Sequence, residues 1–198
     1  MKCLVVIAHP LQDSLCVSLA RLVVDALTAD GHEVETESLY ADGFQPALSA
    51  DERSSYYAAS GYDGTEVDAQ LARLSAAEAL VLVFPTWWFG FPAMLKGWFD
   101  RVWAPGHAYR HASDLSAIEP ALHGLRRTIA ITTLGSPWWV DWLWLRRPVR
   151  RVLARALLGA CAPRCRLDML SLYRAERVER GRLERFERRI LARLRALR

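Results

Sequence analysis

Long uninterrupted apolar runs are missing from this chain of 198 residues. Its apolar stretches are broken at Pro92, Lys96, Asp141 or Arg146, so none reaches the roughly 18 residues that a membrane-spanning helix requires. The chain also opens directly on a strand-like run, without the basic leader and apolar segment of a secretion signal. We therefore expect a soluble protein that resides in the cytoplasm.

Cysteine is scarce, and its spacing excludes two further classes of protein. The four cysteines, Cys3, Cys16, Cys161 and Cys165, form no C-x-x-C pair, and two of them fall inside regular elements. Neither a disulfide framework nor a structural metal site is typical of this pattern. We expect reduced thiols and no bound metal.

Lysine is nearly absent, since Lys2 and Lys96 are the only two, and arginine supplies the positive charge. The net charge of +4 conceals an asymmetry, because residues 146–198 carry 17 basic and 5 acidic side chains. Such a block suits nucleic acid or an anionic membrane, but we favour a solvated helix face in an arginine-rich protein. No nucleic-acid-binding motif accompanies it, so we expect no nucleic-acid partner.

What the sequence does contain is a regular alternation of strand and helix patterns. Residues 40–64 interrupt it as a long polar loop, with one helical turn expected around 50–58. The alternation predicts an α/β fold in which a doubly wound parallel sheet of five strands carries helices on both faces, as a single domain over 1–198. The predicted strands are 2–8, 32–39, 79–84, 127–133 and 166–172, and the predicted helices are 14–30, 67–76, 92–103, 139–159 and 178–197.

Ligands of such sheets lie beyond the carboxyl ends of the strands, which makes the strand-end loops the places to search. The first, residues 9–16, joins a strand to a helix and contains His9 and Ser14. Unpaired amides at a helix N-terminus, a hydroxyl and a histidine together form an anion site that suits phosphate. Neither G-x-G-x-x-G nor a P-loop motif is present, and a plain helix cap by Asp13 or Ser14 is the alternative.

The second loop, residues 85–92, places Trp87, Trp88 and Phe89 beside Gly90 at the end of a core strand. This is a flat apolar wall with accessible backbone, which suits a planar aromatic ring better than it suits ordinary core packing. The third loop, residues 132–137, offers threonine hydroxyls and a glycine that permits close approach of a ligand. An ordinary turn uses the same residues as this third loop.

Together, the HP-x3-S loop, the FPTWWFGFPAMLKGWFDRVW stretch and the ITTLGSP loop resemble the NAD(P)H quinone oxidoreductase family of flavodoxin-like flavoproteins. The most specific piece is residues 84–103, which match P-x-x-W-F-G-x-P-x-x-L-K-G-W-F-D-R-V. The resemblance implies a flavodoxin-like sheet of order 2-1-3-4-5 and a bound flavin, FMN or FAD. It places the flavin phosphate at His9, Ser14, Leu15 and Cys16, and the flavin ring at Pro85, Thr86, Trp87, Trp88, Phe89, Thr132, Thr133 and Gly135.

The same resemblance implies an activity. Hydride passes from NAD(P)H to the flavin, and a quinone or similar electrophilic aromatic acceptor is then reduced in the same slot, which predicts ping-pong kinetics. A flavin-bearing regulatory subunit of a partner such as a potassium-efflux system is the alternative that relatives suggest. An electron-carrying flavodoxin is disfavoured, because those proteins are acidic and this chain has a pI near 9.1.

The chain departs from the family pattern at two places. Cys16 stands where the family often has asparagine, and residues 137–141 replace a tyrosine and a histidine of the animal enzymes, with Trp139 as a possible acceptor-pocket residue. The second departure opens a helical segment at about 138–160, in which four tryptophans precede five arginines. This Trp/Arg segment suits a homodimer interface, which we favour, or peripheral contact of residues 138–155 with an anionic membrane.

Overall fold

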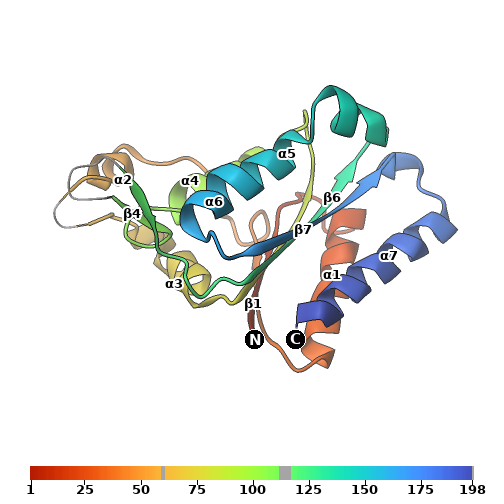
Figure 1. Cartoon of the computed structure of the whole chain (residues 1–198), viewed down its shortest axis with the longest axis horizontal. Helices are drawn as coiled ribbons and strands as arrows, with labels where there is room; N and C mark the ends of the chain where they lie inside the picture. Colours follow the sequence, from red (N-terminus) through yellow and green to blue (C-terminus); the bar gives the residue numbers. More distant parts are fainter. Residues whose placement is uncertain (59–60, 112–116, 198) are drawn as a thin grey trace.

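The computed structural model describes residues 1–58, 61–111 and 117–197. Five parallel strands form its central sheet in the order β2-β1-β3-β6-β7 (Figure 1). Counted along the chain, this is the predicted order 2-1-3-4-5, and the flavodoxin-like fold is confirmed. The five strands are β1 (Lys2–Ile7), β2 (Glu33–Ser38), β3 (Ala79–Pro85), β6 (Arg127–Leu134) and β7 (Arg166–Tyr173).

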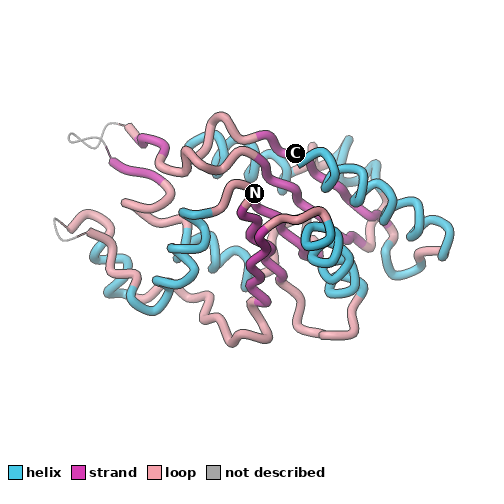
Figure 2. The backbone as a smooth tube through the Cα atoms, turned by 90° about the horizontal axis from the view of Figure 1, so that it is seen from below, coloured by secondary structure: helices cyan, strands magenta, loops and turns pink. Residues whose placement is uncertain are grey.

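Helices cover both faces of this sheet, as the alternation predicted (Figure 2). On one face α1 (Leu15–Ala29) and α7 (Arg180–Leu194) pack side by side (Figure 1). The other face holds α3 (Asp68–Ala76), α4 (Ala93–Val102), α5 (Pro148–Arg151) and α6 (Leu158–Cys161). Among the described helices, none has the length and apolarity needed to cross a membrane.

Strand β3 lies at the centre of the sheet and is buried along its whole length. Its side chains alternate between two cores, with Leu82 facing α4 and Val81 facing α1. A strand covered on both faces has no wet side, which explains its continuous apolar run.

Helix α1 begins and ends at sequence signals. Ser14 is its N-cap, and the Ser14 hydroxyl accepts a hydrogen bond of 3.3 Å from the amide of Val17. At the other end Gly31 has a φ of 77°, and the amide of His32 donates to the carbonyl of Leu27. This Schellman closure fixes where the chain turns back into β2.

The alternation within residues 32–39 predicts a strand with one wet face formed by its glutamates, and in β2 the structure departs from this at Glu37. Glu37 is buried, and its carboxylate accepts hydrogen bonds from Trp98 Nε1 at 2.7 Å and from Arg73 Nη1 at 3.4 Å. Burial raises the pKa of this carboxyl above its ordinary value. Sequence alternation did not reveal that the Trp98 ring of α4 covers this end of the edge strand.

The segment between α4 and β6 contains a structure that the sequence did not predict. Strands β4 (Tyr109–His111) and β5 (Ile118–Pro120) pair antiparallel as a separate two-stranded sheet. Each has only three residues, which is too short to show alternation. The remaining helical pieces are α2 (Ala50–Ser55), which lies within the predicted turn at 50–58, and the 3-10 turns Thr65–Val67, Ala175–Arg177 and Arg195–Leu197.

The Trp/Arg segment is helical but broken. A π-helical turn (Val140–Trp144) ends before Arg146 and Arg147, both of which have a positive φ, and Pro148 then opens α5 at its first position. A second π-helical stretch (Val152–Leu157) links α5 to α6. A proline inside a helical pattern predicts a kink or a split at Pro148, and the structure places the break at the two arginines that precede it.

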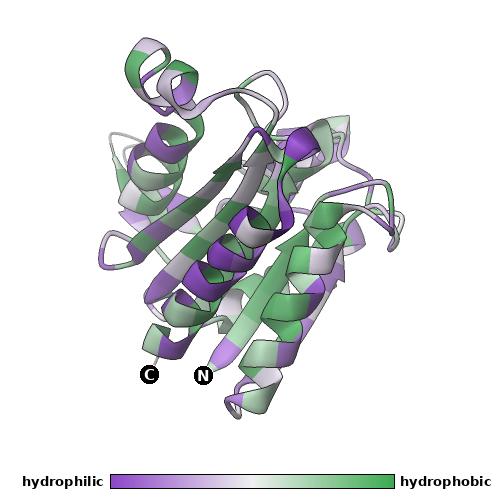
Figure 3. Ribbon diagram, turned by 90° about the vertical axis from the view of Figure 1, so that its right-hand side faces the viewer, coloured by the Kyte–Doolittle hydropathy of each residue, from purple (hydrophilic) through white to green (hydrophobic). Residues whose placement is uncertain are grey.

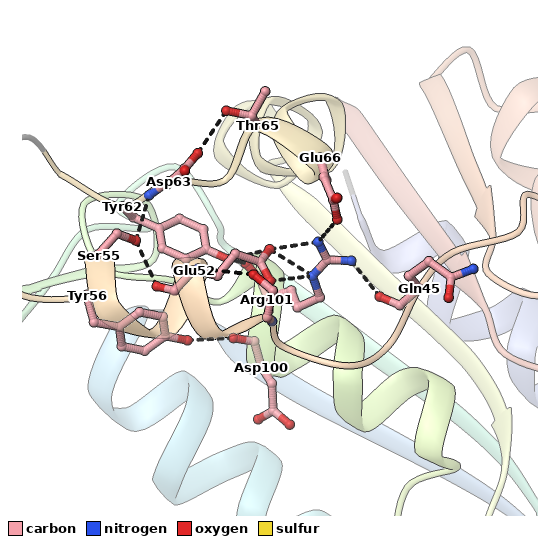
Figure 4. A network of polar contacts seen from close by, with 11 residues as sticks. Gln45, Glu52, Ser55, Tyr56, Tyr62, Asp63, Thr65, Glu66, Asp100 and Arg101 are labelled. Atoms are coloured by element: carbon pink, nitrogen blue, oxygen red, sulfur yellow. Dashed lines mark hydrogen bonds and ion pairs between the residues drawn. The ribbon is translucent and has the colours of Figure 1, made fainter.

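Arg101 of α4 holds the segment from Gln45 to Glu52 against this helix (Figure 4). Its side chain is 2% exposed, and its guanidinium contacts Glu52 at 2.7 Å, Glu66 at 2.7 Å and the carbonyl of Gln45 at 2.6 Å. Nearby, a Cβ on Gly97 would lie 2.1 Å from the Pro46 carbonyl. Only glycine lets the loop approach α4 this closely, which explains the K-G-W-F-D-R run of the sequence.

The ion pair within this network yields a stability prediction. Burial favours the neutral form of Glu52, but hydrogen bonds from Arg101 and Ser49 outweigh it and leave the pKa of this carboxyl below its ordinary value. Glu52→Gln leaves a buried guanidinium short of one charge, so we expect urea denaturation at pH 7 to show a loss of about 3 kcal/mol. Glu66→Gln is the control, because that carboxylate is 75% exposed and its loss should cost under about 1 kcal/mol.

The pH dependence provides a second check on the same pair. Because the folded pKa of Glu52 is lowered, its stabilisation is present above the unfolded pKa of about 4.3 and is lost as the pH falls through the folded pKa. The wild-type and Glu52→Gln stabilities should therefore converge in acid. Parallel curves between pH 7 and pH 3 would contradict this assignment.

Candidate functional site

The first strand-end loop offers several hydrogen-bond donors at one point. His9 Nδ1 accepts from the Leu11 amide at 3.1 Å, so the neutral ring carries its proton on Nε2 as a donor. The Ser14 hydroxyl accepts from within the helix and keeps its own proton to donate. The amides of Leu15 and Cys16 open the first turn, where a helix provides no internal acceptor. This end of α1 therefore presents the unpaired donors that an anion site requires.

Cys16 contributes its backbone amide to this loop and its side chain to the core. The residue is 2% exposed, and burial raises the pKa of its thiol to about 12. The thiol therefore stays neutral and does not replace the amide group that asparagine would bring. All four cysteines are free thiols in the structure, as expected from their spacing.

The second loop presents rings on a strained turn. The amide of Gly90 donates to the carbonyl of Trp87 at 2.9 Å, and the two residues between them, Trp88 and Phe89, have φ values of 49° and 56°. Large side chains rarely occupy this left-handed region, and such strain concentrates at functional sites. Trp88 is fully exposed and Trp87 is 43% exposed, so these rings do not serve the core.

The third loop is joined to the second by threonine contacts. The Thr86 amide donates to the Thr133 carbonyl at 2.8 Å, and the Thr86 and Thr132 hydroxyls share a hydrogen bond of 2.5 Å. Further along, Gly135 is exposed, and a Cβ there would lie 3.0 Å from Glu176 Oε1. The hydroxyl of Ser136 is buried and lacks a hydrogen-bond partner among the described residues.

The structure brings these three loops together at one edge of the sheet. Thr86 ties the second loop to the third, and the His9 and Trp87 rings lie 6.3 Å apart across the first and second. The edge combines an anion site, an aromatic wall and a row of hydroxyl and amide groups. These are the groups that hold the phosphate, the face and the polar rim of a flavin, so the residues present fit that cofactor.

Trp139, the possible acceptor-pocket residue, projects outward and is 45% exposed. The neighbouring Trp138 and Trp142, which lie one helical turn apart, line a cavity together with Tyr173 at the end of β7. The indole of Trp142 donates to the Tyr173 hydroxyl, which in turn donates to the buried Asp141 at 2.7 Å. The sequence analysis did not identify Tyr173, because it lies about 30 positions from the tryptophans. Its position at the carboxyl end of a strand was the signal that could have indicated it.

Comparisons with known proteins agree with this geometry. The chain matches the family described as flavodoxin-like fold over residues 1–194. The NAD(P)H dehydrogenase (quinone) 1 of Rattus norvegicus is 31% identical over 150 residues, which cover 68% of this chain and 54% of the rat protein. Because that share is 54%, this chain spans about half the length of the curated relative.

Solved structures extend the comparison to the whole chain. An NAD(P)H:quinone oxidoreductase from Methanothermobacter marburgensis aligns with a TM-score of 0.81 at 26% identity, covering 100% of this chain and 96% of that one. Smu.1420 from Streptococcus mutans UA159 aligns with a TM-score of 0.82 at 26% identity and covers both chains fully. The chain therefore belongs to the flavodoxin-like fold family, and its named relatives confirm the resemblance to the NAD(P)H quinone oxidoreductases.

Proposed function

We propose that this protein binds a flavin at the three-loop edge and uses NAD(P)H to reduce a quinone or a similar electrophilic aromatic acceptor. The observation that carries the proposal is the convergence of an anion site, an aromatic wall and a polar rim at the carboxyl ends of adjacent strands. The names of the relatives support the same activity. We place it in the cytoplasm, as one domain.

Each loop has a distinct task in this proposal. Donors at His9 and Ser14 hold the cofactor's phosphate, and the exposed rings of Trp87 and Trp88 orient a planar substrate and exclude water. The amides near Gly135 and the free Ser136 hydroxyl stabilise negative charge that develops at the ring edge. A bound flavin supplies the hydride chemistry, so no acid-base triad is required.

We further propose that the flavin is FMN. The α1 terminus suits a single phosphate group. A cavity of about 540 Å³ beside Gly135 would receive the second half of FAD, but it carries Glu176 and Glu179 alongside its arginines and is therefore nearly balanced in charge. A pyrophosphate gains little attraction there. Heat release of the cofactor followed by chromatography distinguishes FMN from FAD.

Steady-state kinetics test the activity. The purified protein should oxidise NAD(P)H when a benzoquinone is added, and double-reciprocal plots at several quinone concentrations should run parallel because donor and acceptor use one slot in turn. Intersecting lines would contradict the shared slot. Flavin binding with negligible turnover would instead favour a regulatory subunit of a partner such as an ion-efflux system.

The anion site at α1 is tested by Ser14→Asp. Aspartate caps a helix as well as serine does, so the free energy of unfolding should change by less than about 0.5 kcal/mol. Its charge repels a phosphate at hydrogen-bond distance, so flavin affinity should fall at least about tenfold. Ser18→Asp adds the same charge one turn further along, at an exposed position, and should retain flavin. Equal flavin affinity in both variants would place the phosphate elsewhere.

The outer tip of the Trp/Arg segment, formed by Trp139, Leu143 and Trp144, is proposed as a homodimer interface. These side chains are 45%, 68% and 78% exposed, which is costly for an isolated monomer. Arg146 and Arg150 beside the tip are exposed as well, and they suit peripheral contact with an anionic membrane as the alternative.

Two measurements separate these roles of the tip. For a dimer, light scattering should give twice the chain mass, and Leu143→Glu combined with Trp144→Glu should halve it while leaving flavin content unchanged. A wild-type monomer that floats with anionic liposomes at low salt, and not with neutral ones, would replace the dimer with membrane contact.

A further inference from the structure

A second cavity of about 490 Å³ lies along β7, and none of its lining residues belongs to the three loops. β7 is the edge strand of the sheet, and the cavity forms between the π-helical turn that carries Trp142 on one side and α7 on the other. It begins next to the third loop, because Trp138 at its rim stands three residues after Gly135. Neither the fold nor the proposed flavin site uses this cavity.

Positive charge dominates its lining. Arg182, Arg185 and Arg189 line it from one face of α7, at the spacing of successive turns, and Arg147 lines it from the opposite wall. No carboxylate belongs to the lining. Within the described residues, Arg147, Arg185 and Arg189 form no ion pair. Four like charges around one space repel one another until an anion occupies it.

Asp141, which follows the first tryptophans of the segment, is already engaged in hydrogen bonds. Asp141 is buried, and it accepts a hydrogen bond from the Tyr173 hydroxyl. The indole of Trp142 donates to the same hydroxyl at 2.9 Å. Through this chain of hydrogen bonds Asp141 fixes two aromatic residues of the wall. Asp141 forms no ion pair with an arginine among the described residues.

Arg147 is held in a strained position with a free donor. It has a φ of 54°, its guanidinium stacks 4.2 Å from the centre of the Trp142 ring, and its Nε is buried without a partner among the described residues. The hydroxyl of Ser171, also in the lining, is buried without a hydrogen bond of good geometry. Buried donors without partners are rare in folded proteins, and a charged one is the most costly. Both groups fit a ligand that supplies oxygen acceptors.

The size and the remaining lining define the organic part of that ligand. A space of about 490 Å³ is much larger than an inorganic anion and falls in the range of small-molecule sites. Aromatic rings of Trp138, Trp142, Tyr173 and Phe186 share the wall with the arginines. Aromatic side chains stack on a planar base, and guanidinium groups bind phosphate through two parallel hydrogen bonds.

We propose that this cavity binds an adenosine phosphate, with its phosphate groups on the four arginines and its base against the aromatic wall. The ligand has two possible sources, which share this chemistry: a free nucleotide, or the adenosine end of NADPH with its 2′-phosphate. The second source rests on the proposed function, because it requires the nicotinamide of the same molecule to reach the flavin beside Gly135. The cavity then selects NADPH over NADH.

Calorimetric titration of the purified protein with adenosine 2′,5′-bisphosphate tests the site without any turnover. We expect binding by the wild type, and at least about tenfold weaker binding by Arg185→Gln combined with Arg189→Gln, since two charged contacts are lost. Arg180→Gln combined with Arg188→Gln is the matched control, because it removes equal charge from α7 at exposed positions outside the cavity. Absence of wild-type binding, or equal losses in both double variants, overturns the proposal.

Kinetics with the two nicotinamides then identify the source. If NADPH places its phosphate in the cavity, the ratio of kcat/KM for NADPH to that for NADH falls at least about tenfold in the Arg185/Arg189 variant and stays constant in the control. A constant ratio in both variants, with bisphosphate binding lost as expected, assigns the cavity to a free nucleotide. A protein without any turnover refutes the proposed function, while the titration still decides the site.

Discussion

The parallel register of β3 and β6 is the constraint on which the functional edge depends. Pro85, the last residue of β3, pairs with Thr133, one residue before the end of β6. Thr86 then bonds to the end of β6 through its amide and its hydroxyl. A shift of one residue would separate these groups and turn every side chain of the strand to the opposite face. Because β3 is buried on both faces, its packing leaves no freedom for such a shift.

Residues outside the site also determine its geometry, by fixing the position of α4. The turn with Trp88 leads directly into α4, so the position of this helix determines where the aromatic wall stands. Arg101 fixes α4 to α2 through Glu52 (Figure 4). Trp98 of the same helix donates a hydrogen bond to Glu37 on β2. Trp98 and Arg101 of the K-G-W-F-D-R run thus support the site from behind, whereas Lys96 and Asp100 pair with each other at the surface.

The strands and the ends of α1 could be predicted from the sequence, because they depend on local patterns. Apolar runs predict the strands, and Ser14 and Gly31 mark the two ends of the helix within a few residues. The burial of Glu37 was not readable, since it results from an indole 61 positions away. The arginine cavity was missed for the same reason: α7 alone has the pattern of a solvated helix, and many of its residues are coloured as hydrophilic in the ribbon of Figure 3.

Because lysine is nearly absent, the positive charge of that cavity comes from arginine alone, and this affects how the site responds to pH. Guanidinium groups remain charged at every pH a cell experiences, whereas amines and imidazoles in a crowded, partly buried cluster lose protons readily. A binding site built from arginines alone therefore does not switch off as the medium becomes alkaline. Its occupancy therefore depends on the concentration and the ionisation state of the ligand. The charge of the protein's own side chains at this site does not change with pH in the cellular range.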